Sequence, residues 1–275
     1  ATAILEPGMR IGLITDIHYH RQIRYGNRHC PDSLAKLKAA LLVFRDRKVS
    51  LIANLGDSID CHGCDTADAD SLADLQCVLA TAPCPIVSVM GNHDLEGLDK
   101  RQFRQAFGMT ERYPGEQIFK DCRLLLLDAN FSASGQDTCG TNWDWRESFL
   151  LPSTLAWLAR QLAESRQSLN LVLVHQNLHD RHAAGREDPH VICNAEAARQ
   201  VMEDSGCQII VLQGHNHAGG RQDLNGIVYL TLRAMCEGPG LANNAFAILD
   251  TESDGSADLI GFGRQTDETI RFPTC

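Results

Sequence analysis

The sequence has no long hydrophobic run, and none of its apolar stretches approaches the ~18 residues that span a bilayer. It also lacks an excess of basic residues, because 35 acidic against 25 basic side chains give a net charge of −10. These two absences argue against an integral membrane protein and against general binding to nucleic acids or anionic membranes. The first ten residues, ATAILEPGMR, do not have the basic and then apolar layout of a signal peptide. We therefore expect a cytoplasmic protein, or a periplasmic one if a signal segment preceded Ala1.

The sequence also has little that would form a disulfide framework or a zinc finger. Its eleven cysteines are an odd number in a chain of 275 residues, and Cys61 and Cys64 form its one CxxC pair. A chain of this length does not need disulfides for stability, so we interpret the thiols as reduced and mostly buried. A local disulfide or redox clip at Cys61 and Cys64 is the alternative. Repeats, low-complexity tracts and Pro/Gly-rich linkers are absent as well, which favours a single domain over residues 1–275.

What the sequence does contain is an alternation of short apolar runs with amphipathic segments. The runs are typical of buried strands, and the segments repeat their apolar residues at the spacing of a helix. Alternating strands and helices followed by several strands predict an α/β fold with two mixed β-sheets packed face to face and helices outside. We expect strands at 10–15, 50–55, 85–90, 122–128, 169–175, 208–213, 226–232, 244–250 and 257–263, and helices at 31–47, 66–80, 151–164 and 194–206.

Residues that can bind a metal follow five of these predicted strands. The first ending, Asp16-x-His18, places a carboxylate and an imidazole two residues apart, where both can bind one ion. A turn would explain any single ending, but five endings at the carboxyl edge of an α/β sheet indicate one site. Glycines at 56, 91 and 214 would let the backbone pass close to a crowded metal centre. The five endings are Asp16 and His18; Asp57; Asn92, His93 and Asp94; His175; and His215 and His217.

In this order the motifs DxH, GD, GNHD, H and GHNH resemble those of the calcineurin-like dinuclear metallophosphoesterases. The resemblance covers residues 10–232 and implies a four-layered α/β/β/α sandwich that hydrolyses phosphoesters with a hydroxide bridging two metal ions. It implies that His93 assists the leaving group and that Asp94 orients His93. It also implies that one ion is bound by Asp16, His18, Asp57 and His217, and the other by Asp57, Asn92, His175 and His215.

The segment from Gln213 to Gly238, together with AFAILD and GFGR, is similar to the Mn²⁺-dependent ADP-ribose/CDP-alcohol diphosphatase branch of that family. This similarity favours Mn²⁺ as the cofactor, and a ligand set of nitrogen and oxygen also suits Fe or Zn²⁺. The branch has a proline soon after the histidine that corresponds to His175, whereas this chain reads VHQNLHDRH. We expect cleavage of a phosphodiester or a nucleotide-type pyrophosphate. A phosphomonoesterase of broad specificity is the alternative, and a non-catalytic scaffold is a remote one.

Basic residues gather directly after the first metal motif. Residues 19–29 contain three arginines and two histidines but no acid, which suits recognition of phosphate oxygens beyond the scissile one. From this stretch we select His20, Arg24 and Arg28 as binding residues for a small-molecule phosphoester, and we add His179 because it follows His175 closely. Trp143 and Trp145 are interpreted as core or lid residues, with stacking on a nucleobase as the alternative.

Overall fold

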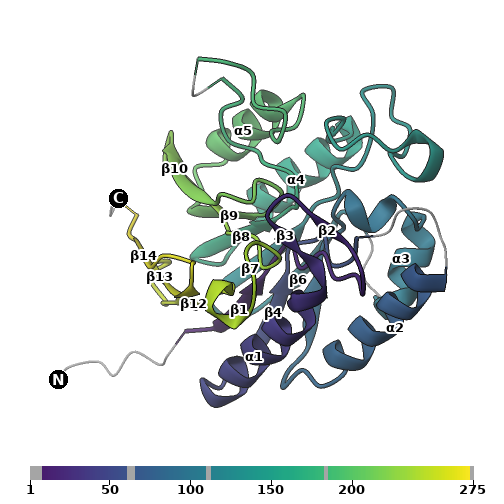
Figure 1. Cartoon of the computed structure of the whole chain (residues 1–275). Coiled ribbons are helices and arrows are strands. Elements are labelled where there is room, and N and C mark those ends of the chain that lie inside the picture. The colour runs from purple at the N-terminus through teal and green to yellow at the C-terminus, as the bar shows by residue number, and fades with distance from the viewer. Residues whose placement is uncertain (1–7, 61–65, 110–112, 183–184, 273–275) are drawn as a thin grey trace.

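Two six-stranded β-sheets pack face to face in the computed structural model of the chain, which describes residues 8–60, 66–109, 113–182 and 185–272 (Figure 1). The first sheet has the order β14 (Glu268–Ile270), β13 (Ala257–Gly263), β12 (Ala245–Thr251), β1 (Arg10–Ile14), β4 (Leu51–Asn54) and β5 (Ile86–Ser88). The second has the order β10 (Gly220–Leu224), β11 (Ile227–Thr231), β9 (Ile209–Gln213), β8 (Leu169–Leu173), β7 (Cys122–Leu126) and β6 (Gly115–Ile118). Each sheet is mixed: β1, β4 and β5 run parallel, as do β7, β8, β9 and β11. The strands β12, β13 and β14 of the first sheet and the edge strands β6 and β10 of the second pair antiparallel with their neighbours.

The strands are apolar along their whole length because both faces of each sheet are covered. Leu171 and Leu173 of β8 face the other sheet, whereas Val172 between them packs against the helices α4 (Pro152–Glu164) and α5 (Ala195–Asp204). In the first sheet, Ile52 of β4 packs in the same way against α1 (Ser33–Asp46) and α2 (Thr66–Leu79). Figure 1 shows these two helix pairs on opposite sides of the sheets. This is the four-layered α/β/β/α sandwich that the sequence predicts.

The structure confirms the nine predicted strands and four predicted helices, with ends that shift by no more than two residues. The elements that the sequence pattern missed are short or lie at sheet edges. The edge strand β10, for example, has the polar sequence GRQDL and no buried residue, so it carries no apolar run. The missed elements are β2 (Arg24–Tyr25), β3 (Arg28–His29), β6, β10, β14, α3 (Lys100–Ala106) and the 3₁₀ helices Cys30–Asp32, His93–Leu95, Gly140–Asn142 and Leu241–Asn243.

The register of the parallel strands brings their carboxyl ends to one level. Ile14 at the end of β1 pairs with Asn54, and Asn54 pairs with Ser88 at the end of β5. In the second sheet, Leu173 of β8 pairs with Leu212 of β9. The loops that follow these strands therefore start side by side at one edge of the two sheets.

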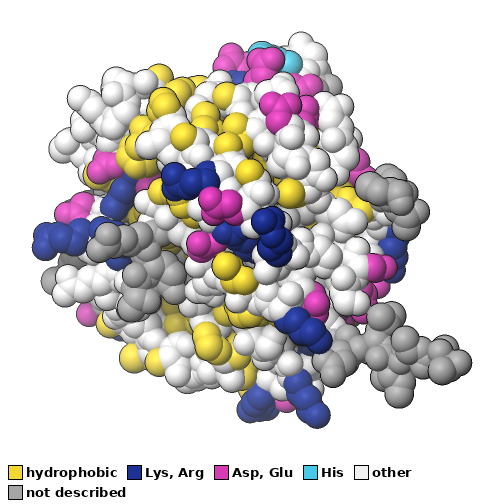
Figure 2. Space-filling model, turned by 180° about the vertical axis from the view of Figure 1, so that it is seen from behind, with side chains coloured by type: hydrophobic (Ala, Val, Ile, Leu, Met, Phe, Trp, Pro, Cys, Tyr) yellow, Lys and Arg dark blue, Asp and Glu magenta, His cyan; other side chains and the backbone are white. Residues whose placement is uncertain are grey.

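The structure allows three expectations from the composition to be compared with the fold: membrane spans, surface charge and the burial of the cysteines. Within the described residues, no helix is both long enough and apolar enough to cross a membrane. Figure 2 shows acidic and basic side chains next to one another on the face turned away from the viewer of Figure 1. The eight described cysteines are all free, but three of them are buried, three are partly buried and two are exposed, so they are less buried than we expected. Cys61 and Cys64 lie outside the described residues.

Candidate metal centre

The loops after β1, β4, β5, β8 and β9 bring the predicted metal ligands together in one buried place. Backbone hydrogen bonds join the loops: the N–H of Asp16 donates to the carbonyl of Gly56, and the N–H of Gly214 donates to the carbonyl of His175, both at 3.0 Å. Six of the seven predicted ligands are buried and His217 is partly exposed. The first sheet supplies Asp16, His18, Asp57 and Asn92, and the second supplies His175, His215 and His217.

Asp57 lies between two groups of potential ligands. Its Oδ2 atom is 3.4 Å from Nε2 of His18 and 3.1 Å from Nε2 of His175. Ligand atoms of Asp57 and His18 lie within 4.8 Å of Asp16, and those of Asp57 and His175 lie within 4.8 Å of His215. One carboxylate therefore belongs to both groups, as a ligand shared by two ions would.

Several buried ligand atoms in this place make no hydrogen bond, although Nε2 of His175 lies 3.1 Å from Oδ2 of Asp57. Among the described residues, Oδ1 of Asp16, both amide atoms of Asn92, and Nε2 of His175 and of His215 are buried and make no hydrogen bond. An unsatisfied buried polar group costs ~1–3 kcal/mol, so a cluster of them is stable only with an additional partner. The ring of His175 is already oriented, because its Nδ1 lies 2.8 Å from the carbonyl of Leu55 and leaves Nε2 as the acceptor. The residues present therefore fit bound metal ions.

The backbone of the ligand loops is strained in the same place. Asp16, His18, Asp57 and His215 have positive φ angles of 48°, 44°, 52° and 66°. Residues other than glycine rarely adopt this left-handed conformation, which costs on the order of 1–3 kcal/mol and clusters at functional sites. All four residues are predicted ligands, so the strained positions coincide with the metal centre.

Glycines allow the loops to approach one another, as the sequence predicts. A Cβ atom on Gly91 would lie 2.1 Å from Oδ1 of Asp57, and one on Gly214 would lie 2.1 Å from Oγ1 of Thr15. Gly56 has a φ of 97°, and a Cβ there would lie 2.7 Å from Nδ1 of His175. A side chain at any of the three positions would displace a residue of the metal centre.

His93 lies beside the two ligand groups and contacts carboxylates on both sides. Its backbone N–H donates to Oδ1 of Asp57 at 2.8 Å, and its Nδ1 lies 3.4 Å from Oδ1 of Asp60 and 3.2 Å from Oε2 of Glu96. Burial alone would lower the pKa of His93, but these carboxylates raise it to about 9. Nη1 of Arg28 lies 3.4 Å from the other ring nitrogen, Nε2.

The expected role of Asp94 is wrong, because its carboxylate does not contact His93. Asp94 is fully buried and accepts hydrogen bonds from backbone N–H groups of the second and third ligand loops. Asp60 and Glu96 contact His93 instead, and Asp60 also lies 3.6 Å from Nδ1 of His18. The donors to Asp94 are the N–H groups of Asp57 and Gly91 at 2.9 Å, Ser58 at 2.7 Å and Ile59 at 3.2 Å.

A cavity of about 990 Å³ opens over the metal ligands. The hairpin of β2 and β3 forms one wall and supplies Arg24, Arg28 and Tyr25, a residue that is 77% exposed. Trp145 lines the cavity as well and lies 5.5 Å, ring to ring, from His190. Two of the four predicted substrate-binding residues, both of them arginines, therefore face this cavity.

The other two predicted substrate-binding residues lie elsewhere. His20 is buried, and its Nδ1 accepts hydrogen bonds from the backbone N–H groups of Gln22 and Ile23, so it orders a turn. His179 is buried too, with Nδ1 2.9 Å from Nε2 of Gln213, and it lines a separate cavity of about 170 Å³. These placements differ from the prediction, which rested on closeness in sequence to metal ligands.

Three residues of the site were not singled out from the sequence: Asp60, Tyr25 and Glu237. Asp60 had a signal in the motif GDSID, where it follows Asp57 by three residues. Tyr25 lies in the basic stretch 19–29, between two arginines. Glu237 had no local signal, because it reaches the site from a loop after β11 and contacts Nδ1 of His217 at 2.7 Å.

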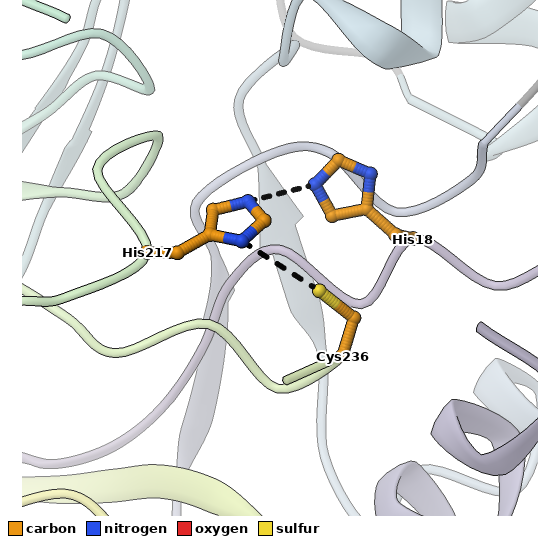
Figure 3. Close-up of side chains that lie close together, drawn as sticks. All are labelled: His18, His217 and Cys236. Atoms are coloured by element: carbon orange, nitrogen blue, oxygen red, sulfur yellow. Dashed lines mark hydrogen bonds between the residues drawn. The ribbon is translucent and has the colours of Figure 1, made fainter. Parts of the chain in front are cut away.

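Cys236 lies behind a ligand rather than among the ligands. Nε2 of His217 is 3.2 Å from Nε2 of His18, whereas Sγ of Cys236 is 3.9 Å from the other ring nitrogen, Nδ1. Figure 3 shows His18 and Cys236 at these two nitrogens of the His217 ring. The nitrogen that faces Asp16 is Nε2, at 3.5 Å from Oδ1, so the thiol packs on the far edge of the imidazole.

This fold and site define a dinuclear type of phosphoesterase. The sequence model of the Calcineurin-like phosphoesterase family matches residues 9–219, and the chain belongs to this family. It is a metal-dependent enzyme that hydrolyses phosphoesters.

Individual relatives match along nearly the whole chain. The Manganese-dependent ADP-ribose/CDP-alcohol diphosphatases of Xenopus tropicalis and Danio rerio are each 24% identical over 97% of this chain, and the matches cover 95% and 99% of those proteins. The crystal structure of a dimetal phosphatase from Danio rerio has a TM-score of 0.82 at 23% identity and covers 98% of this chain and 100% of that one. A purple acid phosphatase from yellow lupin has a TM-score of 0.63 at 14% identity, covering 94% of this chain and 52% of its own. The two structures confirm the fold, and the two relatives confirm the resemblance to the diphosphatase branch.

Proposed function

We propose that this enzyme cleaves the pyrophosphate bond of a small nucleoside diphosphate derivative, of the class that includes ADP-ribose and CDP-alcohols, with two Mn²⁺ ions. The observation that supports this most directly is the cavity, which joins metal ligands, arginines and aromatic side chains. Its volume of about 990 Å³ suits a nucleotide-sized molecule. The names of the two vertebrate relatives support the same substrate class.

The walls of the cavity offer a separate surface for each part of such a substrate. Arg28 lies beside His93, where its guanidinium suits charged hydrogen bonds to the second phosphate. Tyr25 and Trp145 offer ring faces on which a nucleobase can stack, which is worth ~1–3 kcal/mol per base. A simple phosphomonoester would use the metal ligands but neither of these surfaces.

The ligand atoms divide into two sites that share Asp57. Asp16, His18 and His217 complete one site, and Asn92, His175 and His215 complete the other. Bound ions supply positive charge to the scissile phosphate and make water a better nucleophile at neutral pH. All six donors besides Asp57 are oxygen or nitrogen groups, a set that Mn²⁺ accepts.

The protein itself supplies the proton for the leaving group. Asp60 and Glu96 hold a proton on His93, and its Nε2 edge faces Arg28 and the cavity. These carboxylates favour the doubly protonated ring, whose Nε2 proton can pass to the departing phosphate or alkoxide. Such general acid catalysis is worth ~10²–10⁴-fold in rate. Trp143 packs against the ring at 5.3 Å and donates its indole N–H to the carbonyl of Asn92, so the acid is held in one orientation.

The test is a substrate panel on protein that has been stripped with a chelator and reloaded with Mn²⁺, Fe²⁺ or Zn²⁺ in turn. ADP-ribose and CDP-choline represent the proposed class, bis-p-nitrophenyl phosphate a diester, and p-nitrophenyl phosphate a monoester. We expect the highest kcat/KM for the two pyrophosphates with Mn²⁺. A higher kcat/KM for the monoester would replace the proposal with a broad phosphomonoesterase.

A further inference from the structure

We propose that Glu237 is a positioning residue that couples the metal ligand His217 to the hairpin of β2 and β3, which faces the substrate. The part of the proposal that concerns the substrate rests on the proposed function. The part that concerns the metal rests on the contact between Glu237 and His217. Glu237 lies in the loop of residues 235–238 after β11 and lines the large cavity. Its two carboxylate oxygens contact different parts of the site.

The first oxygen orients His217. Oε1 of Glu237 lies 2.7 Å from Nδ1 of His217, and the side chains of both residues are 17% exposed. The opposite nitrogen, Nε2, faces Oδ1 of Asp16 at 3.5 Å. A carboxylate that accepts the Nδ1 proton fixes the tautomer and the ring angle of a histidine, so that Nε2 is free to bind a metal, and loss of such a partner typically lowers metal affinity ~10–100-fold.

The second oxygen holds the hairpin. Oε2 of Glu237 accepts a hydrogen bond from the side-chain amide of Asn27 at the turn between β2 and β3. The backbones continue this contact, because the N–H of Gly238 donates to the carbonyl of Asn27 and the N–H of His29 donates to the carbonyl of Cys236, both at 2.9 Å. The same hairpin carries Tyr25 and Arg28 into the cavity, so a single side chain links the substrate wall to a metal ligand.

A buried lysine fixes the loop independently of the Glu237 carboxylate. Lys36 of α1 is 0% exposed, and its Nζ donates to the carbonyls of Met235 at 2.9 Å, Glu237 at 3.0 Å and Gly238 at 2.8 Å. Three acceptors satisfy the three donors of an ammonium group. Because these contacts use backbone atoms, the loop keeps its place when the side chain of residue 237 is changed.

The experiment compares Glu237→Ala, Glu237→Gln and Asn27→Ala with the exposed control Glu164→Ala on α4. Mn²⁺ affinity is measured by calorimetry on metal-free protein, and KM is measured with ADP-ribose and with bis-p-nitrophenyl phosphate. We expect Glu237→Ala to lower Mn²⁺ affinity ~10–100-fold and to raise KM for ADP-ribose. Glu237→Gln keeps an oxygen for His217 and should lose less affinity. Asn27→Ala should leave Mn²⁺ affinity unchanged and raise KM for ADP-ribose alone, and Glu164→Ala should match the wild type.

Two results would overturn the proposal. One is wild-type Mn²⁺ affinity and wild-type KM in Glu237→Ala. The other is an equal loss of Mn²⁺ affinity in Glu237→Ala and Asn27→Ala with an equal fall in the Tm of the metal-free proteins, because this would show general damage to the loop. If the wild type does not cleave ADP-ribose, the proposed function fails, and the calorimetry still decides whether Glu237 orients His217.

Discussion

Asp60 contacts two histidines: its Oδ1 lies 3.4 Å from Nδ1 of His93, and its Oδ2 lies 3.6 Å from Nδ1 of His18. A single carboxylate thus lies against both the proposed general acid and a proposed metal ligand. The two rings are only 4.8 Å apart and both turn Nδ1 toward Asp60, but they differ at Nε2. Nε2 of His93 lies 3.4 Å from Nη1 of Arg28 at the cavity, whereas Nε2 of His18 lies 3.4 Å from Oδ2 of Asp57.

The substitution His93→Ala should retain both metal ions and lose ~10²–10⁴ in kcat. The reason is that His93 contacts Asp57 through its backbone N–H, which alanine keeps, while the proton donor is lost. The loss should be smaller for bis-p-nitrophenyl phosphate, whose leaving group needs no proton, than for ADP-ribose. Elemental analysis and steady-state kinetics on the two substrates check this. Loss of metal in His93→Ala would identify His93 as a ligand.

The substitution Arg28→Gln should act on substrate binding instead. KM for ADP-ribose should rise by an amount equivalent to one hydrogen bond to a charged group, ~1.5–3 kcal/mol. Nitrophenyl esters, which have no second phosphate, should show little change. Arg45→Gln, on the exposed face of α1, is the matched control and should behave as the wild type. Equal losses on all substrates would show that Arg28 does not recognise the distal phosphate.

Asp57→Asn should be the most damaging ligand substitution for metal content. Asp57 belongs to both ligand groups, whereas Asp16 belongs to one. After reconstitution with Mn²⁺, we expect Asp16→Asn to keep about one ion per chain more than Asp57→Asn does, because the shared carboxylate also offsets repulsion between the ions. Elemental analysis of both variants measures the difference, and identical metal contents would exclude a shared ligand.

Asp94→Asn should lower stability rather than remove a catalytic group. The carboxylate accepts four backbone N–H groups, and an amide offers one acceptor and places an N–H₂ donor against two of those groups. We expect the free energy of unfolding to fall by about 3 kcal/mol. Urea denaturation compares this variant with Asp46→Asn at the exposed end of α1, which should change stability by less than ~0.5 kcal/mol. An Asp94→Asn variant that keeps its stability but loses activity would indicate that Asp94 has a catalytic role.

The fold was largely predictable because its central strands are buried on both faces and are therefore continuous apolar runs. Strands such as β10 and β14 were missed because β10 is polar and β14 is only three residues long. The assignment of residues 1–275 to one domain stays a prediction.

The proposed ligands were predictable for a similar reason: each follows directly after a strand, so local sequence contains the signal. Side chains that act across the fold have no such signal. Glu237 reaches His217 from another loop, and Asp94 stands next to His93 in sequence but contacts the backbone of other loops. Adjacency in sequence was a poor guide for His20 and His179 as well, because both point into the protein.

The division of the ligands between the two sheets has a mechanical consequence. Asp16, His18, Asp57 and Asn92 extend from one sheet and His175, His215 and His217 from the other, so ions bound among them would connect the two sheets at the edge where the ligand loops lie. The two sheets are otherwise joined by apolar contacts, which are not directional, whereas coordination bonds would fix the lateral position of one sheet against the other. Ion binding would then stabilise the folded, aligned layers over the unfolded chain. A free ion concentration of one hundred times the dissociation constant would add about 2.7 kcal/mol to the free energy of unfolding.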